Sequence, residues 1–348
     1  MDMTDWFPTD RQQRIDLPLY ERELRDFLPD RVYDIHTHIG LPEHMGPISA
    51  ERIAESWALE VSPPLPIEGL AEAQAGLFPG KRVRSLAFAM PVRECNLPDG
   101  NAYVAKGIAD NRIDGLLVSD PTWSAEVLAN YLDDGGYLGL KPYPDLCRDK
   151  PAGEVGIPDY FPEAHQKLAD ERGLIVMLHI PRKERLRDPR NQQELREIAN
   201  RYSNIKLIVA HIGRAYTMSY VENALPALDD CPSLVYDFAA NLNEDVLAFT
   251  LREVGPQRLL YGSDLPVTLM RGVREYDGDK YINYTDGDYS WNVNRKPPEI
   301  EAEYTFYLYQ QLLAFKRAAE RIGLSSADVA DVMCGNAERL VAGVTTAS

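Results

Sequence analysis

Two histidines separated by one residue end a short run of β-branched and aromatic residues at positions 32–38, with the sequence VYDIHTH. Alternate residues of a β-strand point to the same side, so His36 and His38 can direct their imidazoles at one point. Nitrogen atoms in this arrangement are typical ligands of a divalent metal ion such as Zn²⁺. We therefore interpret the pair as the first part of a metal site and look for its remaining ligands further along the chain.

Three more residues with metal-binding side chains stand at the ends of apolar runs. His179 and His211 each end such a run, and Asp264 ends a third. A single histidine in this position is usually a core residue, but four of the chain's six histidines lie at the ends of predicted strands. The other two, His44 and His165, fall in a loop and in a helical pattern, and we expect both to be solvated, with contact to the substrate as the alternative for His44.

Two charged residues accompany these candidates. Lys141 ends another apolar run, where its ammonium group must either reach solvent or find an anionic partner. Asp34 lies two residues before His36 and points to the same side of the strand. It has two interpretations, a partner that orients a metal-binding histidine or a buried hydrogen bond that pins the strand, and the sequence favours neither.

Arginines that follow the predicted strands are candidates for binding an anionic substrate. Arg214 follows His211 by three residues, and its planar guanidinium suits a two-point contact with a carboxylate. Arg93, Arg271 and Arg274 also follow strands. Because a single arginine is more often a surface residue, we predict substrate binding for Arg214 alone.

Apolar, β-rich runs alternate with amphipathic helical patterns along the chain. Strands are expected at residues 32–38, 85–90, 113–119, 137–143, 174–180, 205–212, 234–239 and 259–264. Helices are expected at residues 50–60, 101–110, 123–133, 160–172, 192–202, 220–228, 244–254 and 301–322. Eight such units predict an α/β fold, a closed (β/α)8 TIM barrel. An open doubly wound sheet is the alternative, but it would not bring the ends of the first, fifth, sixth and eighth strands to one point.

The chain divides into an N-terminal extension, residues 1–30, and a single barrel domain, residues 31–345. Two segments, 61–84 and 265–300, are too long for simple connections, and we expect them to be loops inserted after strands 1 and 8. Loops that follow barrel strands lie on the catalytic face. The second insertion is rich in tyrosine, aspartate, glycine and asparagine, which suggests a lid.

The composition restricts the partners and the location of the protein. A formal net charge of −17 opposes binding to nucleic acid, so a small molecule is the expected substrate. No apolar run approaches the length of a membrane span, and the N-terminus lacks the pattern of a signal peptide, which predicts a cytoplasmic protein without membrane contact. Four cysteines without a C-x-x-C pair argue against a disulfide framework. A homo-oligomer is compatible with the sequence.

The ordered set of motifs resembles the amidohydrolase superfamily of metal-dependent barrels. Within it, the closest similarity is to the branch that holds aminocarboxymuconate semialdehyde decarboxylase together with several lactonases and hydratases. The resemblance covers roughly residues 31–341. The motifs that carry it are DIHTH at 34–38, Lys141, His179, AHIG at 210–213, GSD at 262–264 and CGNAERL at 334–340.

This resemblance implies the parts that the residues play. His36, His38, His179 and Asp264 would bind one divalent metal ion, expected to be Zn²⁺, with Mn²⁺ as the alternative. Asp264 would also accept a proton from the attacking water, and His211 would polarise the substrate or bind the metal directly.

Lys141 has two interpretations within the superfamily. Binuclear members carry a carboxylated lysine at the end of strand 4 that bridges two metal ions. In the branch that this chain most resembles, one metal ion is the commoner state, and Lys141 would be a cation for a substrate carboxylate.

The predicted function is a metal-dependent hydrolase that attacks the carbonyl of an ester, a lactone or an amide. A non-oxidative decarboxylase or hydratase of an unsaturated or aromatic carboxylic acid is the alternative. TatD-like nucleases share the first histidine pair, but they normally carry glutamate where this chain has Lys141. A barrel that only binds or scaffolds would show degraded ligands, whereas here all are present.

Overall fold

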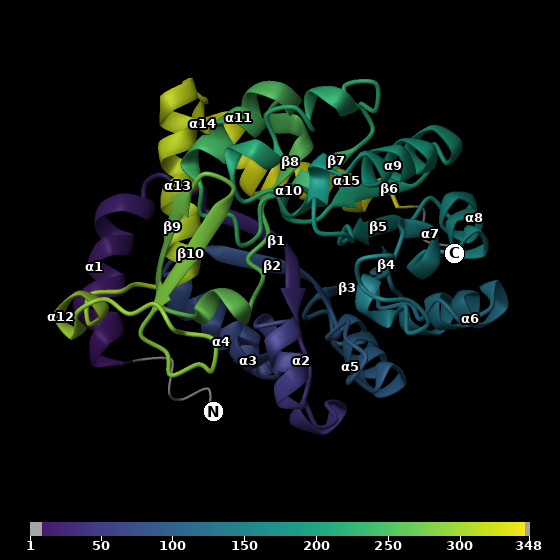
Figure 1. Ribbon diagram of the computed structural model, residues 1–348, viewed down its shortest axis with the longest axis horizontal. Helices are drawn as coiled ribbons and strands as arrows, with labels where there is room; N and C mark the ends of the chain where they lie inside the picture. The colour runs from purple at the N-terminus through teal and green to yellow at the C-terminus, as the bar shows by residue number, and fades with distance from the viewer. Residues whose placement is uncertain (1–8, 345–348) are drawn as a thin grey trace.

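Eight parallel strands form the centre of the molecule, in the computed structural model that describes residues 9–344. They follow one another around the sheet in chain order, from β1 to β8. Their bounds are β1 Arg31–His38, β2 Arg82–Phe88, β3 Asp114–Leu117, β4 Gly139–Leu140, β5 Ile175–Leu178, β6 Lys206–Val209, β7 Val235–Asp237 and β8 Leu259–Leu260. Figure 1 shows these strands in the middle of the molecule with helices around them.

Backbone hydrogen bonds between β1 and the segment from the end of β8 complete the ring. The amide of Ile35 donates to the carbonyl of Tyr261 at 3.0 Å, and the amide of Asp264 donates to the carbonyl of His36 at 2.8 Å. The predicted (β/α)8 barrel is therefore confirmed, and the open-sheet alternative is wrong.

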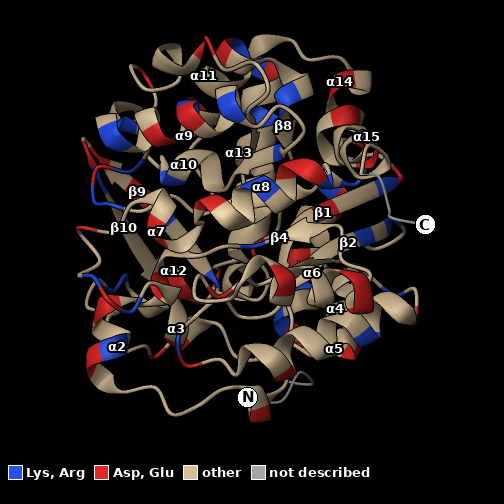
Figure 2. Ribbon diagram, turned by 90° about the vertical axis from the view of Figure 1, so that its right-hand side faces the viewer, with Lys and Arg blue, Asp and Glu red and all other residues tan. Residues whose placement is uncertain are grey.

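Helices cover the outside of the barrel. Their bounds are α1 Leu17–Leu19, α2 Ala50–Glu55, α3 Ala58–Val61, α4 Ile67–Leu77, α5 Leu97–Ala109, α6 Ala125–Gly135, α7 Ile157–Tyr160, α8 Glu163–Glu171, α9 Pro189–Arg201, α10 His211–Arg214, α11 Glu244–Val254, α12 Pro298–Glu301, α13 Tyr307–Ile322, α14 Ser326–Ala330 and α15 Asn336–Ala342. Several begin at side-chain caps that satisfy free amides of the first turn; for example, Asn243 accepts from two amides of α11. Charged residues lie mostly on these helices and on the loops (Figure 2).

Prolines account for two differences from the predicted helices. The helix expected at 220–228 is replaced by two 3-10 turns, Met218–Tyr220 and Pro226–Leu228, because proline lacks the amide that a helix interior needs. The helix expected at 160–172 is divided into α7 and α8 on either side of Pro162.

Both predicted insertions contain regular structure. The segment 61–84, expected as a loop, holds α4, whose Leu70, Ala73 and Leu77 are buried on one face. The segment 265–300 holds an antiparallel hairpin of β9, Gly272–Asp277, and β10, Lys280–Thr285. In Figure 1 this hairpin lies to one side of the barrel, near α13.

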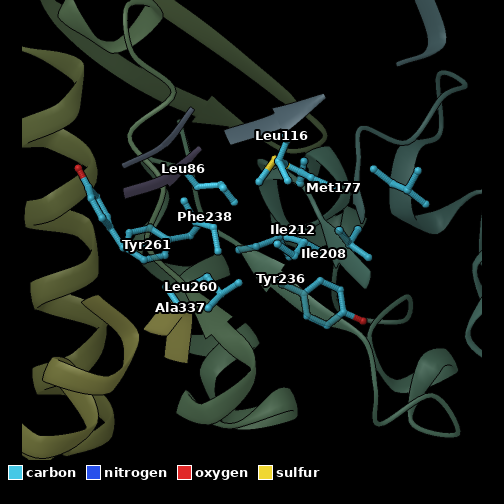
Figure 3. Packing of buried hydrophobic residues seen from close by; sticks show 14 of the residues in the cluster. Leu86, Leu116, Met177, Ile208, Ile212, Tyr236, Phe238, Leu260, Tyr261 and Ala337 are labelled. Carbon is cyan, nitrogen blue, oxygen red and sulfur yellow. The ribbon is translucent and has the colours of Figure 1, made fainter. Parts of the chain in front are cut away.

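The apolar core fills the space between strands and helices. Figure 3 shows part of it, with Leu86 of β2, Leu116 of β3 and Met177 of β5 among the labelled side chains. Phe238 and Tyr261 lie with their ring centroids 5.8 Å apart, and Phe238 also stacks on Phe315 of α13. This rigid interior holds the strand ends, and the side chains that follow them, at fixed positions.

Candidate metal centre

Three candidate ligands converge at the carboxyl-terminal end of β1 and just after β8. The Nε2 atom of His38 lies 3.4 Å from Oδ1 of Asp264, and the Nε2 atom of His36 lies 3.6 Å from the same oxygen. One ligand atom from each residue lies within 4.8 Å of the other two, and all three side chains are buried. Barrel closure therefore brings the histidine pair and the late carboxylate to one point.

Asp34 fixes the two strand segments that carry these ligands. Its carboxylate accepts hydrogen bonds from the amide of Ser263 at 2.8 Å, the hydroxyl of Ser263 at 2.5 Å and the amide of His36 at 3.2 Å. Burial raises the pKa of Asp34 to about 7 against the opposing effect of these hydrogen bonds. The side chain thus pins β1 to the segment after β8, which is the second of its two predicted interpretations.

Asp237, at the end of β7, orients His36 instead. Its Oδ2 lies 3.0 Å from Nδ1 of His36, and its Oδ1 accepts from the amides of His211 and Ala239. Because a carboxylate oxygen accepts hydrogen bonds, Nδ1 of His36 carries the proton and Nε2 presents a free lone pair toward Asp264. Sequence reasoning missed this residue; its signal was a lone acid inside a strand that is otherwise apolar.

His211 lies beside the three ligands. Its ring centroid is 4.6 Å from that of His36, and its Nδ1 lies 2.9 Å from the carbonyl oxygen of Ala239. A carbonyl accepts only, so Nδ1 of His211 is also protonated and Nε2 is free to act. His36, His211 and Asp237 form a second group of potential ligand atoms within 4.8 Å of one another.

His179, at the end of β5, lies further along the same row of rings. Its centroid is 5.3 Å from that of His211 and 4.6 Å from that of Tyr143. Among the residues that the structure describes, His179 belongs to neither group of close ligand atoms. The structure thus places it at the edge of the cluster formed by His36, His38 and Asp264.

Lys141 points into the barrel and is completely buried. Its Nζ lies 3.4 Å from Nε2 of His36 and 4.5 Å from the ring centroid of Phe88. Burial lowers the pKa of Lys141 to about 7, although Asp237 and Asp264 act in the opposite direction. The lysine therefore does not reach solvent, and it stands beside the candidate ligands.

The charges of the cluster suit a divalent cation. Burial lowers the pKa of both His36 and His38, which favours neutral imidazoles with free lone pairs. Burial acts to raise the pKa of Asp264, but His211, His38 and His36 outweigh it and hold the value at about 2. Two neutral nitrogen donors and one ionised oxygen donor are the ligand chemistry that Zn²⁺ and Mn²⁺ accept.

The predicted arginines occupy different surroundings. Arg214 is half-buried, and its Nη1 contacts the carbonyl of Ile180 at 3.4 Å; its charge adds to the effect of burial in lowering the pKa of His179. Arg93 is exposed and bound to Asp145 at 2.9 Å. Arg271 instead forms a hydrogen-bonded ion pair with Asp16 of the N-terminal segment. Arg214 thus remains at the cluster, and the other two have structural partners.

Left-handed backbone conformations gather in the loops around these residues. Within residues 9–344, eight non-glycine residues have positive φ angles: Asn111, Arg182, Arg185, His211, Ile212, Arg214, Ala240 and Asp264. All except Asn111 follow strands β5 to β8. Each such conformation costs about 1–3 kcal/mol of folding free energy. They cluster at functional sites, where a side chain has to point in a set direction.

The two remaining histidines are buried, so the expectation that both are solvated is wrong. His165 lies on the inner side of α8, with Nε2 2.8 Å from the carbonyl oxygen of Trp123. His44 accepts from the amide of Leu41 through Nδ1 and packs on the ring of Tyr103 at 5.5 Å. Both have polar partners that a helical or loop pattern cannot reveal.

The fold is a (β/α)8 barrel, and the cluster places histidine and carboxylate side chains at the carboxyl ends of its strands. A family model described as Amidohydrolase matches residues 93–342. The chain belongs to this family of metal-dependent enzymes, and the resemblance drawn from its motifs is confirmed at that level. No protein among the curated sequences matches the chain.

Solved structures share the fold at low sequence identity. An amidohydrolase from Burkholderia multivorans with bound zinc has a TM-score of 0.56 and 17% identity, covering 89% of this chain and 99% of its own. A probable 2-pyrone-4,6-dicarboxylic acid hydrolase from Acinetobacter baumannii has a TM-score of 0.55 and 14% identity over the same shares. The 5-carboxyvanillate decarboxylase from Sphingomonas paucimobilis has a TM-score of 0.52 and 14% identity, covering 91% and 100%.

Among the described residues, no helix has the length and apolar character that crossing a bilayer requires.

Proposed function

We propose that this protein is a metal-dependent hydrolase that directs water onto the carbonyl of an ester, a lactone or an amide in a small substrate bearing a carboxylate. The cluster of His36, His38 and Asp264, with ligand atoms within 4.8 Å of one another, carries this proposal. Membership of the amidohydrolase family supports it. We place the protein in the cytoplasm, whose reducing conditions suit the free cysteines.

His36, His38, His179 and Asp264 are the proposed metal ligands. The first two and Asp264 already converge, and His179 would complete the set from β5. Zn²⁺ is our first choice and Mn²⁺ our second, because nitrogen and oxygen donors suit both. A divalent ion held there would supply Lewis-acid chemistry for the activation of water.

The protein's own groups then divide the remaining tasks. Asp264, ionised and aimed at the cluster, takes a proton from the attacking water and returns it to the leaving group. His211 presents Nε2 next to the cluster, where an Nε2–H would donate to and polarise the substrate carbonyl and a bare Nε2 would bind the metal ion directly. Arg214 binds the substrate carboxylate, and Lys141 adds a second positive charge beside His36.

A binuclear site is the alternative for Lys141. The second group of close ligand atoms, His36, His211 and Asp237, supports it because a second ion would need donors there. Metal analysis separates the two arrangements: we expect one equivalent per chain. Two equivalents, together with electron density for a carboxylate group on the Lys141 amine, would replace the mononuclear proposal with the binuclear one.

The proposed function is tested by replacing one ligand and measuring metal content and hydrolysis together. We expect His38→Asn to lose bound metal and to abolish hydrolysis of a panel of lactones, esters and amides. His165→Asn is the matched control, since His165 is also a buried histidine but lies outside the cluster. A metal-free preparation of the wild-type chain with full activity would contradict the proposal.

Decarboxylation is a second candidate that one observation favours. The rings of Tyr143, His179, His211 and Tyr216 follow one another at centroid distances of 4.6, 5.3 and 6.5 Å, a surface that suits an aromatic acid. Reaction in ¹⁸O-labelled water separates the candidates. Hydrolysis places the label in the product, whereas decarboxylation releases carbon dioxide and leaves no labelled oxygen in the organic product.

A further inference from the structure

Three half-buried arginines at the mouth of the barrel lack an acidic partner. Arg185, Arg214 and Arg274 make no ion pair with any carboxylate in residues 9–344. Neighbouring arginines do: Arg182 pairs with Glu194, and Arg187 pairs with Glu184 and Asp279. In a chain with 54 acidic residues and a net charge of −17, three unpaired cations in one place require a reason.

Arg185 and Arg274 share the same two aromatic rings. The Cζ atom of Arg185 lies 5.4 Å from the ring centroid of Tyr216 and 5.7 Å from that of Tyr281. The Cζ atom of Arg274 lies 5.0 and 4.5 Å from these same centroids. Cation–π contacts of this kind hold guanidinium groups in place but do not neutralise them. Two like charges are therefore held close together without a counter-charge from the described chain.

Most N–H groups of these side chains are free for a ligand. A guanidinium has five N–H donors. Arg185 uses one, from Nη1 to the carbonyl of Arg214, and Arg274 uses Nε for Asn283 and Nη1 for the carbonyl of Ala240. The bonds already made fix the planes of both groups, so the remaining donors point in set directions. This arrangement is suited to a carboxylate, which accepts several parallel N–H bonds.

The pair is connected to the candidate metal centre by Tyr216. Its ring centroid lies 6.5 Å from that of His211 and 5.4 Å from that of Tyr281 on β10. The hairpin that carries Tyr281 and Arg274 is tied to the loop after β5 by the ion pair of Arg187 with Asp279, at 3.1 Å. Arg185 also adopts a left-handed backbone, with φ of 55°, a strain that persists when a side chain is needed in one direction.

We propose that Arg185 and Arg274 form a second anion subsite, so that the substrate is a dicarboxylic acid. One carboxylate binds Arg214 close to His179, and the other binds the Arg185 and Arg274 pair across the ring of Tyr216. A planar substrate would lie against Tyr216 and Tyr281. The inference deepens the proposed hydrolase and rests on it for the position of the reacting carbonyl, but the subsite itself lies outside the metal ligands.

Binding of two probe acids to the zinc-reconstituted full-length chain tests the subsite. Benzoate carries one carboxylate and isophthalate carries two on the same ring. We expect isophthalate to bind at least roughly tenfold more tightly, as two charge-assisted hydrogen bonds would provide. Arg185→Gln and Arg274→Gln should each remove most of this preference while leaving benzoate binding within about twofold, as measured by calorimetry.

Two further variants keep the test decisive. Arg93→Gln is the matched control, because Arg93 also follows a barrel strand but already has an acidic partner, Asp145, and takes no part in holding the hairpin; it should keep the preference. Arg274→Lys retains the charge and should keep part of it, even if Arg274→Gln unfolds in a thermal melt. Equal binding of both acids to the wild-type chain, or an unchanged preference in both glutamine variants, would overturn the inference.

The results also separate this inference from the proposed function. Suppose that the arginine variants lose the preference for isophthalate over benzoate, but that the wild-type chain binds no metal. This result would support the subsite and contradict the proposed hydrolase. Normal zinc content with a zinc-dependent hydrolysis, but no preference for isophthalate, would leave the hydrolase standing and overturn the subsite.

Discussion

At the scale of single residues, the candidate centre depends on which nitrogen of each histidine is free. Nδ1–H of His36 donates to Asp237 and Nδ1–H of His211 donates to the carbonyl of Ala239, so that both Nε2 atoms face the cluster. A hydrogen bond of this kind fixes the ring and increases its basicity as a ligand. We therefore expect the buried carboxylate of Asp237 to increase metal affinity, although it contacts His36 on the side of the ring that faces away from the metal centre.

Asp237→Asn tests this dependence. The amide keeps the size of the side chain but can no longer accept with full charge, so zinc affinity should fall by about 10- to 100-fold. Competition with a chromogenic chelator measures the change. Asp16→Asn is the control: Asp16 is an equally buried carboxylate, bound to Arg271 and Thr305 far from the cluster, and its loss should lower stability without changing zinc affinity. Equal zinc affinities in the two variants would exclude the orienting role of Asp237.

Arg214→Ala tests the substrate contact at the same scale. Removal of a charge-assisted, two-point contact should raise KM for a carboxylate substrate by about tenfold or more, with a smaller change in kcat. Arg93→Ala provides the comparison, because Arg93 is exposed and bound to Asp145. Steady-state kinetics on both variants give the answer, and an unchanged KM in Arg214→Ala would remove this residue from the site.

At the scale of elements, the insertion after β8 closes one side of the barrel mouth. The hairpin of β9 and β10 brings Tyr281 to Tyr216, and the following loop packs Trp291 on Trp57, next to α3, with ring centroids 5.2 Å apart. Tyr289 stacks on Trp291 at 5.4 Å. Loops after β1 and β8 are thus held together by aromatic contacts, which supports the lid suggested by the composition of this segment.

Trp291→Ala should loosen this closure without unfolding the barrel. The lost contacts belong to two surface segments, so we expect faster proteolysis within residues 272–297 and a higher KM, while the thermal melting temperature changes by only a few degrees. Val293→Ala is the control on the same loop, since Val293 is 81% exposed and should have no effect. If Trp291→Ala and the wild-type chain are cleaved at equal rates, the packing of these segments is not what holds the lid.

The elements also show what a sequence can and cannot predict. The sequence predicts the pairing of His36 and His38 because strand periodicity aligns them. It predicts the barrel because eight apolar runs alternate with helical patterns. Asp237 was missed because a lone acid in a strand has no spacing partner that marks its role. Helix α4 was not predicted because Pro63, Pro64 and Pro66, which precede it, indicate a loop. The burial of His165 was not predicted because it depends on tertiary packing, about which helical periodicity carries no information.

At the scale of the whole molecule, the N-terminal segment is part of the barrel's support. The ring of Tyr20 stacks on Tyr309 of α13 with centroids 6.0 Å apart, and Phe27 packs on Phe315 at 5.7 Å. Asp16 binds Arg271, which precedes the hairpin strand β9. The segment before β1 therefore shares its packing with the helix that lies against β9 and with the start of the β9–β10 hairpin.

Tyr20→Ala should consequently destabilise the whole barrel. Tyr20 is completely buried, and its hydroxyl donates to the carbonyl of Pro79 at 3.0 Å, so truncation leaves a cavity and an unpaired acceptor. We expect a loss of about 3–5 kcal/mol in the free energy of unfolding, measured by urea denaturation. Arg14→Ala, which removes an exposed ion pair with Glu303 and an exposed hydrogen bond to the carbonyl of Ala302, should cost about 1 kcal/mol or less. Because Tyr20 touches neither the ligands nor the arginine pair, the folded fraction of Tyr20→Ala should bind zinc as the wild type does; weakened zinc binding in that fraction would mean that the N-terminal segment also shapes the metal centre.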